Sequence, residues 1–354
     1  MNTSGDHLAN TPTEGALRPP SPEVAALATE RLAGLATPPG ALGQLGHLAV
    51  WLAAAQGEVP PRLLTNVRLV IFAGDHGVAQ HGVSAYPPAI TAAMVRTFVA
   101  GRAGVSALAA AHDVHVRVLD LGVDGDLHDV PDEVTAHKIR RGSGAIHLED
   151  ALSAEETSQA LEVGASIARE EIAAGAQLLL SGDMGIGNTT PSAALVAAAL
   201  GLPASEVTGR GTGVDDAALA RKQEIIDQAL NRVGRRTEDP VSTLTALGSA
   251  DLAAATGYLI AAAHAGVPVL LDGLISVACA LTADRIAPGS AAWFAAGHRS
   301  TEPAQSLALS KMGLEPVLDL GMRLGEGSGA VAAVPVLRSA VAVLRDVALL
   351  ADLL

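Results

Sequence analysis

The feature that most constrains the fold of this chain is a repeated alternation of short apolar runs with longer alanine-rich segments. Six runs are mostly hydrophobic with no strict alternation of polar residues, as expected of strands covered on both faces. They occupy residues 67–73, 114–119, 176–181, 267–271, 291–296 and 316–320, with 134–139 as a further expected strand. The alternation predicts an α/β fold, with a doubly wound, mostly parallel sheet of Rossmann-like type.

Helices are expected between and beyond these strands. The expected helical segments are 22–56 with a break at Thr37-Pro-Pro-Gly40, 88–100, 104–111, 153–174, 193–200, 215–233, 250–265, and a long C-terminal helix bent or broken at Pro335. This pattern predicts a disordered tail at 1–20, a small helical domain from 21–60 plus about 331–354, and a large α/β domain at 61–330.

Composition narrows the class of protein. Of the 354 residues, 49% are hydrophobic and only 2% aromatic, so the core must be built from small aliphatic side chains. The net charge of −14 argues against nucleic acid or an anionic membrane as a partner. The apolar stretch 252–283 is interrupted by His264, Pro268 and Asp272, and reads as helix, strand, helix rather than a membrane span.

Compartment and redox state follow from the chain start and the cysteine count. Residues 1–20 lack the apolar segment of a signal peptide, so we expect a cytoplasmic protein. The single cysteine, Cys279, lies in an apolar run and is expected to be a buried structural thiol.

A glycine-rich segment at 181–192 carries the strongest local signal. It joins a predicted strand to a predicted helix, and Gly185 and Gly187 allow the backbone to turn tightly and approach a ligand. Asn188, Thr189 and Thr190 add polar side chains at a helix start, where free N–H groups favour an anion such as phosphate. An ordinary βα turn remains the alternative interpretation of this segment.

A second glycine-flanked segment, Leu320 to Ala330, places Glu326 between Gly325 and Gly327. Ser328 is the expected helix cap. Glu326 either stabilises the helix dipole or acts as a base that a ligand can reach. Apolar neighbours would raise its pKa and the helix start would lower it.

Polar residues follow nearly every predicted strand. They are Asp75-His76, Asp183, Asp272, His298-Arg299 and Glu326. In open α/β sheets ligands bind at the carboxyl ends of the strands, so these side chains are expected to surround a site.

Several of these residues have an alternative interpretation. His76 and His298 either take part in chemistry or only shape their turns. The histidines lack metal-ligand spacing, so no metal is expected. Asp215 or Asp216 is expected to begin a helix. The acidic side chains of 153–174 are expected on a solvated face; they are Glu155, Glu156, Glu162, Glu170 and Glu171.

Taken together, these motifs resemble those of the nicotinate-nucleotide:dimethylbenzimidazole phosphoribosyltransferases, which make the lower ligand of cobalamin. The resemblance runs from about Pro38 to the C-terminus. It is carried by Pro38-Pro-Gly-Ala-Leu-Gly43, Asp75-His-Gly-Val78, Gly187-Asn-Thr-Thr-Pro191, Val267-Pro-Val-Leu-Leu-Asp-Gly273 and Arg323-Leu-Gly-Glu-Gly-Ser-Gly329.

The resemblance implies roles for particular residues. Glu326 corresponds to the family's general base, and Asp183 stands where some members have a glutamate. The nucleotide site is implied at Gly185, Ile186, Gly187, Asn188, Thr189, Thr190, Lys222 and Arg323. The base pocket is implied at Tyr86, Met94, Met184 and Leu324, and further candidates are Asp75, His76, Asp272 and His298.

The implied reaction transfers the phosphoribosyl group of nicotinate mononucleotide to dimethylbenzimidazole and needs no cofactor. The resemblance also implies a homodimer. Two other functions stay open: a transferase that uses phosphoribosyl pyrophosphate with magnesium, and a nucleotide-binding protein without turnover.

Overall fold

The computed structural model describes residues 17–353 and contains a six-stranded sheet in which every pairing is parallel. The strand order is β2-β1-β3-β4-β5-β6. The strands are β1 (Val67–Gly74), β2 (Val114–Gly122), β3 (Leu178–Met184), β4 (Val269–Leu271), β5 (Phe294–His298) and β6 (Pro316–Leu318). The predicted α/β class and parallel sheet are confirmed.

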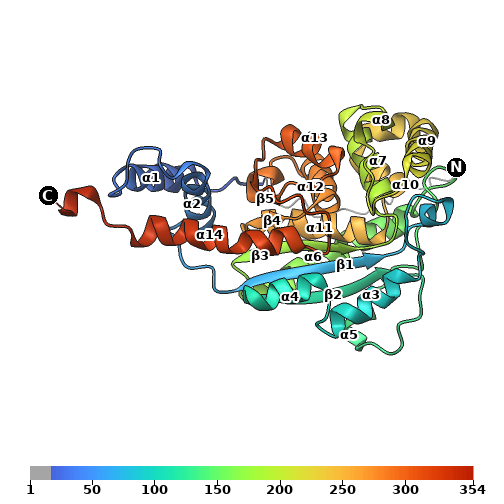
Figure 1. The fold of residues 1–354 in the computed structure, drawn as a ribbon, viewed down its shortest axis with the longest axis horizontal. Coiled ribbons are helices and arrows are strands. Elements are labelled where there is room, and N and C mark those ends of the chain that lie inside the picture. The colour runs from blue at the N-terminus through green and yellow to red at the C-terminus, as the bar shows by residue number, and fades with distance from the viewer. Residues whose placement is uncertain (1–16, 354) are drawn as a thin grey trace, which may run out of the picture.

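Helices flank the sheet and extend beyond both of its ends (Figure 1). The α-helices are α1 (Pro22–Ala33), α2 (Gly43–Gln56), α3 (Ile90–Val99), α4 (Gly104–Ala111), α5 (Asp132–Thr135), α6 (Ala154–Ala173), α7 (Thr189–Leu200), α8 (Ala204–Val207), α9 (Asp216–Val233), α10 (Pro240–Leu247), α11 (Ala250–His264), α12 (Leu274–Ile286), α13 (Pro303–Met312) and α14 (Ser328–Asp346). Short 3₁₀ turns are η1 (Gly77–His81), η2 (Gly234–Glu238), η3 (Ser290–Trp293) and η4 (Leu350–Leu353).

Alternate side chains of the strands enter two separate apolar layers. In β1, Val70 and Phe72 pack with α6, α7 and α10–α13, whereas Leu69 and Ile71 pack with α1–α4 and α14. Successive strand residues point to opposite faces, so each strand must be hydrophobic throughout. The small side chains allow close helix packing: a Cβ on Gly257 of α11 would lie 2.0 Å from the Leu161 carbonyl oxygen of α6.

The strand predicted at 134–139 is wrong. Pro131 precedes the single helical turn α5, and the buried Val134 belongs to that turn rather than to a strand. The following segment touches β2 only through separate bonds, including Ile139 N–H to the Leu121 carbonyl at 3.0 Å. Proline and two acidic residues at the start favour a helical turn over a strand.

Two helix interpretations also need correction. α14 runs through Pro335, so of the two predicted alternatives, a bend or a break, the break is wrong; Val334 and Leu337 on either side of the proline are fully buried. Packing therefore offsets the backbone hydrogen bond that proline removes. Glu171 is not solvated: it is 2% exposed and pairs with Arg68 and Arg117.

The first two helices of the chain pack against the last long helix. α1 and α2 are next to the C-terminal part of α14, at the end of the molecule opposite α7–α10 (Figure 1). Because α14 is continuous from the sheet to α1 and α2, the domain boundary predicted near 331 falls inside a helix. The small helical domain stays a prediction. Most of the predicted disordered tail, 1–16, lies outside the described residues, and Arg18 accepts a hydrogen bond from Trp293.

Among the described residues, α14 is the one helix long and apolar enough to cross a membrane by length and composition, and 56% of its apolar window is buried in the protein. That burial is typical of a core helix. The stretch 252–283 forms α11, β4 and α12, as predicted. Cys279 is fully buried, which confirms its expected place in the core.

Candidate functional site

The candidate site lies at the carboxyl edge of the sheet, where the strand order changes direction. β1 pairs with β2 on one side and with β3 on the other. The connections from β1 and β3 leave in opposite directions at this point, so a crevice opens between their ends. The Asp75-His76 turn and the Gly185–Asn188 loop follow these two strands.

The turn after β1 buries Asp75 and His76. Asp75 Oδ2 accepts a hydrogen bond from Asp124 N–H at 2.8 Å, and burial raises the pKa of Asp75. His76 Nε2 lies 3.5 Å from Asp251 Oδ2, and both side chains are 1% exposed. Burial opposes protonation of His76, but the nearby Asp251, Asp75 and Asp183 outweigh it and raise its pKa. This turn therefore places a buried histidine beside a buried aspartate under the crevice.

Asp251 is a site residue that the sequence analysis missed. It follows Ser249, the cap of α11, and so looks like an ordinary first-turn acid. Its position against His76 depends on how closely α11 packs beneath β1. A Cβ on Gly74 would lie 2.5 Å from Asp251 Oδ1, so only glycine permits this approach.

The glycine loop begins later than predicted, because β3 continues to Met184. The Gly185 backbone lies against β1: a Cβ there would be 2.3 Å from the Gly74 carbonyl oxygen and 2.7 Å from His76 Nε2. Gly187 has φ +89°, and α7 starts at Thr189. The strand–loop–helix order predicted for this segment is confirmed, and the loop presents the N-terminus of α7 to the crevice.

Asp183 lies in the strand itself and faces this loop. Asn188 Nδ2 donates to its Oδ2 at 2.9 Å. Burial, followed by repulsion from Asp272, raises the pKa of Asp183 to about 7. Asp251 and Glu326 also face it and act in the same direction. Asp183 is thus a carboxyl group that holds its proton close to neutral pH.

Lys222 reaches the same loop from α9. Its Nζ donates to Thr189 Oγ1 at 3.0 Å, and the side chain is 1% exposed. Burial lowers the pKa of Lys222, while Glu302 acts in the opposite direction. A buried ammonium at a helix N-terminus favours a bound anion.

The loop 208–213 covers this lysine. A Cβ on Gly211 would lie 3.2 Å from Lys222 Nζ, and Glu302 Oε1 accepts from Gly211 N–H at 2.8 Å. Arg323 Nη1 donates to the Gly211 carbonyl at 3.4 Å. Glu302, a second residue that the sequence analysis missed, directly precedes the proline of α13 and looks like a plain helix start.

Glu326 lies where the last loop crosses the sheet edge. It has φ +67°, an uncommon value for a residue other than glycine. Its Oε2 accepts from Val105 N–H in the first turn of α4 at 3.0 Å. Burial raises the pKa of Glu326, the Val105 bond lowers it, and the charge of Asp272 raises it further. The side chain is therefore a desolvated carboxylate at a glycine-lined opening.

Asp272, rather than Ser328, caps α14. Its carboxylate accepts from three backbone N–H groups, those of Gly327, Gly329 and Ala330. Ser328 makes no side-chain cap because it is the first helical residue, after Gly327. His298 Nε2 is 3.5 Å from Asp272 Oδ1. The candidates Asp272 and His298 therefore support the loop that carries Glu326.

The four residues assigned to a base pocket are only partly gathered. Leu324 lies close to Gly104, where a Cβ would be 2.8 Å from Leu324 Cδ2. Met94 of α3 and Met184 of β3 pack against the same apolar layer. Tyr86 is 54% exposed in a loop that is tied to Thr212 through Ala85 N–H.

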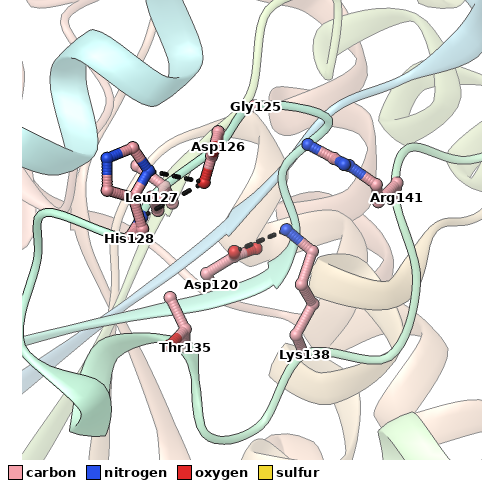
Figure 2. Close-up of a pocket in the computed structure, with 8 residues that line it drawn as sticks. All are labelled: Asp120, Gly125, Asp126, Leu127, His128, Thr135, Lys138 and Arg141. Atoms are coloured by element: carbon pink, nitrogen blue, oxygen red, sulfur yellow. Dashed lines mark hydrogen bonds and ion pairs between the residues drawn. The ribbon is translucent and has the colours of Figure 1, made fainter.

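A separate hollow of about 360 Å³ lies beyond the end of β2 and is lined by none of the predicted site residues (Figure 2). In it, Lys138 Nζ donates to the buried Asp120 at 2.8 Å and His128 lies against Asp126. Over residues 17–353, three or more histidine, cysteine or acidic side chains nowhere gather closely enough to hold a metal ion.

Comparison with known proteins gives a consistent result. The family model described as "Phosphoribosyltransferase" matches residues 17–352. The nicotinate-nucleotide--dimethylbenzimidazole phosphoribosyltransferase of Mycolicibacterium paratuberculosis is 54% identical over 94% of this chain and 95% of its own length. The enzyme of the same name from Mycobacterium leprae strain TN is 49% identical, with the same coverage. The crystal structure of CobT from Thermus thermophilus superposes with a TM-score of 0.89 at 44% identity, over 94% of this chain and 98% of that one.

Proposed function

This chain belongs to the phosphoribosyltransferase family of those enzymes and is itself a phosphoribosyltransferase, and we propose that its substrates are nicotinate mononucleotide and dimethylbenzimidazole. The products are α-ribazole 5′-phosphate and nicotinate. The resemblance found in the sequence motifs is confirmed by the family match.

The chemistry needs one base and no general acid. The C1′–N bond of the nucleotide breaks, and its electron pair neutralises the pyridinium nitrogen of the departing nicotinate. A ring nitrogen of dimethylbenzimidazole attacks C1′ from the opposite face, which inverts the configuration. The attacking ring must then lose its N–H proton, and Glu326 accepts that proton.

The buried carboxylate of Glu326 is the observation that carries this assignment. It is 6% exposed, it lies between two glycines at the carboxyl edge of the sheet, and burial raises its pKa toward the range in which a base works efficiently. Asp183, on β3, lies beside Glu326. In its deprotonated form, Asp183 is suited to stabilise the positive charge that develops on the ribose ring.

The nucleotide phosphate is assigned to the loop from Gly185 to Thr190. The N-terminus of α7 and the ammonium of Lys222 converge there, and Arg323 lies on the adjoining loop. Held at the phosphate, the ribose C1′ is fixed relative to the incoming base. Leu324, Met184, Met94 and Tyr86 are assigned to the flat apolar ring of dimethylbenzimidazole, for which aliphatic and aromatic surface is the suitable lining.

We further propose a cytoplasmic homodimer that works without a metal or other cofactor. Support comes from the resemblance and from exposed apolar side chains outside the assigned pocket, among them Leu27 and Leu320. Light scattering of the purified protein tests the dimer, and activity after exhaustive chelation tests the metal independence.

The decisive experiment is chromatographic assay of metal-free protein with nicotinate mononucleotide and dimethylbenzimidazole. We expect nicotinate and α-ribazole phosphate to appear together. Glu326→Gln keeps the size and the Val105 hydrogen bond but cannot take a proton, so kcat should fall by roughly 100-fold or more while the nucleotide still binds. Normal turnover by this variant would remove Glu326 as the base.

The two alternatives give different results in the same assay. A transferase that uses phosphoribosyl pyrophosphate would turn over only with that donor and magnesium. A binding protein would retain nicotinate mononucleotide without releasing nicotinate, whichever azole or phenol is added.

A further inference from the structure

The loop that carries Glu326 has an unusual backbone. Gly325, Glu326 and Gly327 have φ values of +76°, +67° and +91°, so three successive residues are left-handed. For glutamate this conformation is strained relative to the common regions. It persists only where neighbouring structure holds it, and the position of the Glu326 carboxylate depends on it.

Asp272 provides that hold directly after the predicted base. Gly327 N–H donates to Asp272 Oδ2 at 3.2 Å, and the N–H groups of Gly329 and Ala330 donate to Oδ1 at 2.7 and 2.9 Å. Asp272 is fully buried at the end of β4, so no water competes for these bonds. A carboxylate that accepts three backbone N–H groups at a helix start is a strong anchor.

Asp272 is itself fixed from β5. The His298 ring lies beside its Oδ1 and against Gly329, where a Cβ would be 2.0 Å from His298 Cδ2. Gln305 Nε2 donates to the main-chain carbonyls of both Asp272 and His298, at 3.2 and 2.8 Å. The ends of β4 and β5 are thereby joined behind the loop.

The opposite side of the loop has no room to move. A Cβ on Gly182 of β3 would lie 2.4 Å from the Glu326 carbonyl oxygen. The Glu326 backbone is therefore held between β3 on one side and the Asp272 carboxylate on the other, while its side chain extends to Val105 N–H.

We propose that Asp272, supported by His298, is a positioning residue that holds the loop carrying Glu326 and so sets where the Glu326 carboxylate lies. This inference rests on the proposed role of Glu326 as the base. It assigns Asp272 no contact with substrate, and it explains why a buried aspartate is paired with backbone N–H groups rather than with a lysine or arginine.

Asp272 affects Glu326 through its negative charge as well as through its hydrogen bonds to the loop. The groups facing Glu326 are Asp183 from β3, Asp272 from β4 and the Val105 N–H from α4, and His298 faces Asp272. After burial, the negative charge of Asp272 is what raises the pKa of Glu326. Removing that charge should lower the pKa of the base.

Asp272→Asn tests both effects. The asparagine oxygen can still accept from Gly329 and Ala330, but its NH₂ group then meets the Gly327 N–H, so the residue next to Glu326 loses its acceptor. We expect kcat to fall roughly 10- to 100-fold with the KM for nicotinate mononucleotide changed less than about twofold. The acid limb of the pH–kcat profile should move to lower pH.

Asp120→Asn is the matched control. Asp120 is also a fully buried aspartate near a strand end. Its carboxylate accepts from Val123 N–H at 2.8 Å and pairs with Lys138 (Figure 2), so its hydrogen bonds go to residues other than 325–330. Its variant should keep the wild-type kcat and pH profile. If kcat fell equally in both variants, the effect would be one of general destabilisation, and the proposal would be overturned.

Other outcomes are equally decisive. A folded Asp272→Asn protein with unchanged kcat and acid limb, or one in which only KM rises, overturns the positioning role. If this variant does not fold, His298→Gln takes its place, because it leaves the carboxylate and its three bonds intact. A lower kcat at unchanged KM then supports the proposal, and an unchanged kcat overturns it.

Amide hydrogen exchange separates this inference from the proposed reaction. Exchange at residues 325–330 should be slow in the wild-type protein and faster in Asp272→Asn, whatever substrate the enzyme uses. If the wild-type protein released no nicotinate but the exchange result held, the proposed reaction would fail while the support of the loop by Asp272 would stand. Unchanged exchange would overturn that support.

Discussion

At the scale of single residues, the site is dominated by carboxyl groups buried close to one another. Asp183 is the clearest case, since burial and the charge of Asp272 raise its pKa to about 7. In the unfolded chain the same group titrates near its ordinary value of 3.8. Between these two values the folded protein retains a proton that the unfolded chain releases, so rising pH destabilises the fold across this range.

Asp183→Asn should remove this pH dependence. Asparagine cannot ionise, and its oxygen can still accept from Asn188. We expect the variant to gain stability relative to wild type as the pH rises from about 4 to 7, by a few kcal/mol at most, with a constant difference above pH 7. Thermal unfolding at pH 5 and pH 8 measures it, with the exposed Asp319→Asn as control. An equal difference in Tm at both pH values would contradict the raised pKa.

The sequence supported the choice of Glu326 because a carboxylate between two glycines at a helix start is visible without a structure. It did not indicate the partners. Val105 and Asp272 lie far from Glu326 along the chain, and only the crossing of loops at the sheet edge brings them to it. For the same reason Asp251 and Glu302 looked like ordinary first-turn acids.

At the scale of elements, the predicted phosphate site depends on two helices: the N-terminus of α7 lies against the side of α9. α7 supplies a free N-terminus after the glycine loop, and α9 supplies Lys222 from its buried face. Burying an ammonium is costly without an anion, and Thr189 Oγ1 is its hydrogen-bond acceptor. The helix N-terminus and the lysine together are therefore suited to hold a phosphate equally in the ground state and in the transition state.

Lys222→Ala should consequently raise the KM for nicotinate mononucleotide by roughly 10-fold or more, with a smaller change in kcat. Steady-state kinetics across nucleotide concentrations provide the measurement. Lys311→Ala is the control, because that lysine is exposed in the last turn of α13. A fall in kcat alone, at unchanged KM, would show that Lys222 does not hold the phosphate.

Apart from the strand wrongly predicted at 134–139, the types of the predicted elements were correct, and their ends were less predictable. α7 starts at Thr189, before the expected start at Ala193, although Thr189, Thr190 and Pro191 are weak helix formers. Proline is tolerated because the first N–H groups of a helix have no intrahelical partner. The spacing of apolar residues in a sequence indicates which part of a helix or strand is buried. Where the element begins and ends depends instead on capping residues and on neighbouring loops.

At the scale of the whole molecule, the order of the strands decides where the site lies. No local pattern states that β1 lies between β2 and β3, yet this order opens the crevice at Asp75 and Gly185. That the polar strand ends converge could be predicted from the parallel strands alone. To locate the crevice among them, the order of the strands in the sheet must also be known, and this order follows from the packing of helices onto both faces.

The packing of the first helix against the C-terminal segment is the second feature at this scale. Arg31 donates to the carbonyls of Leu344 and Arg345, at 2.6 and 3.1 Å. Beyond α14, Leu350 N–H donates to the Gly34 carbonyl at 2.8 Å, and Leu35 and Leu349 form an antiparallel bridge. These contacts tie α1 to the C-terminus at the end of the molecule away from the candidate site.

Leu349→Ser should therefore loosen α1 without affecting substrate binding. Leu349 is partly buried in the apolar layer that includes Ala28 and Leu35, so its loss should cost about 1–2 kcal/mol of local stability. We expect faster amide exchange over 22–35, unchanged exchange in β3 and α7, and an unchanged Kd for nicotinate mononucleotide. Leu353→Ser, at a side chain 63% exposed, is the matched control. Faster exchange in α7 or weaker nucleotide binding would show that the two ends of the molecule are coupled, so that the helices at the chain ends contribute to the site through the sheet.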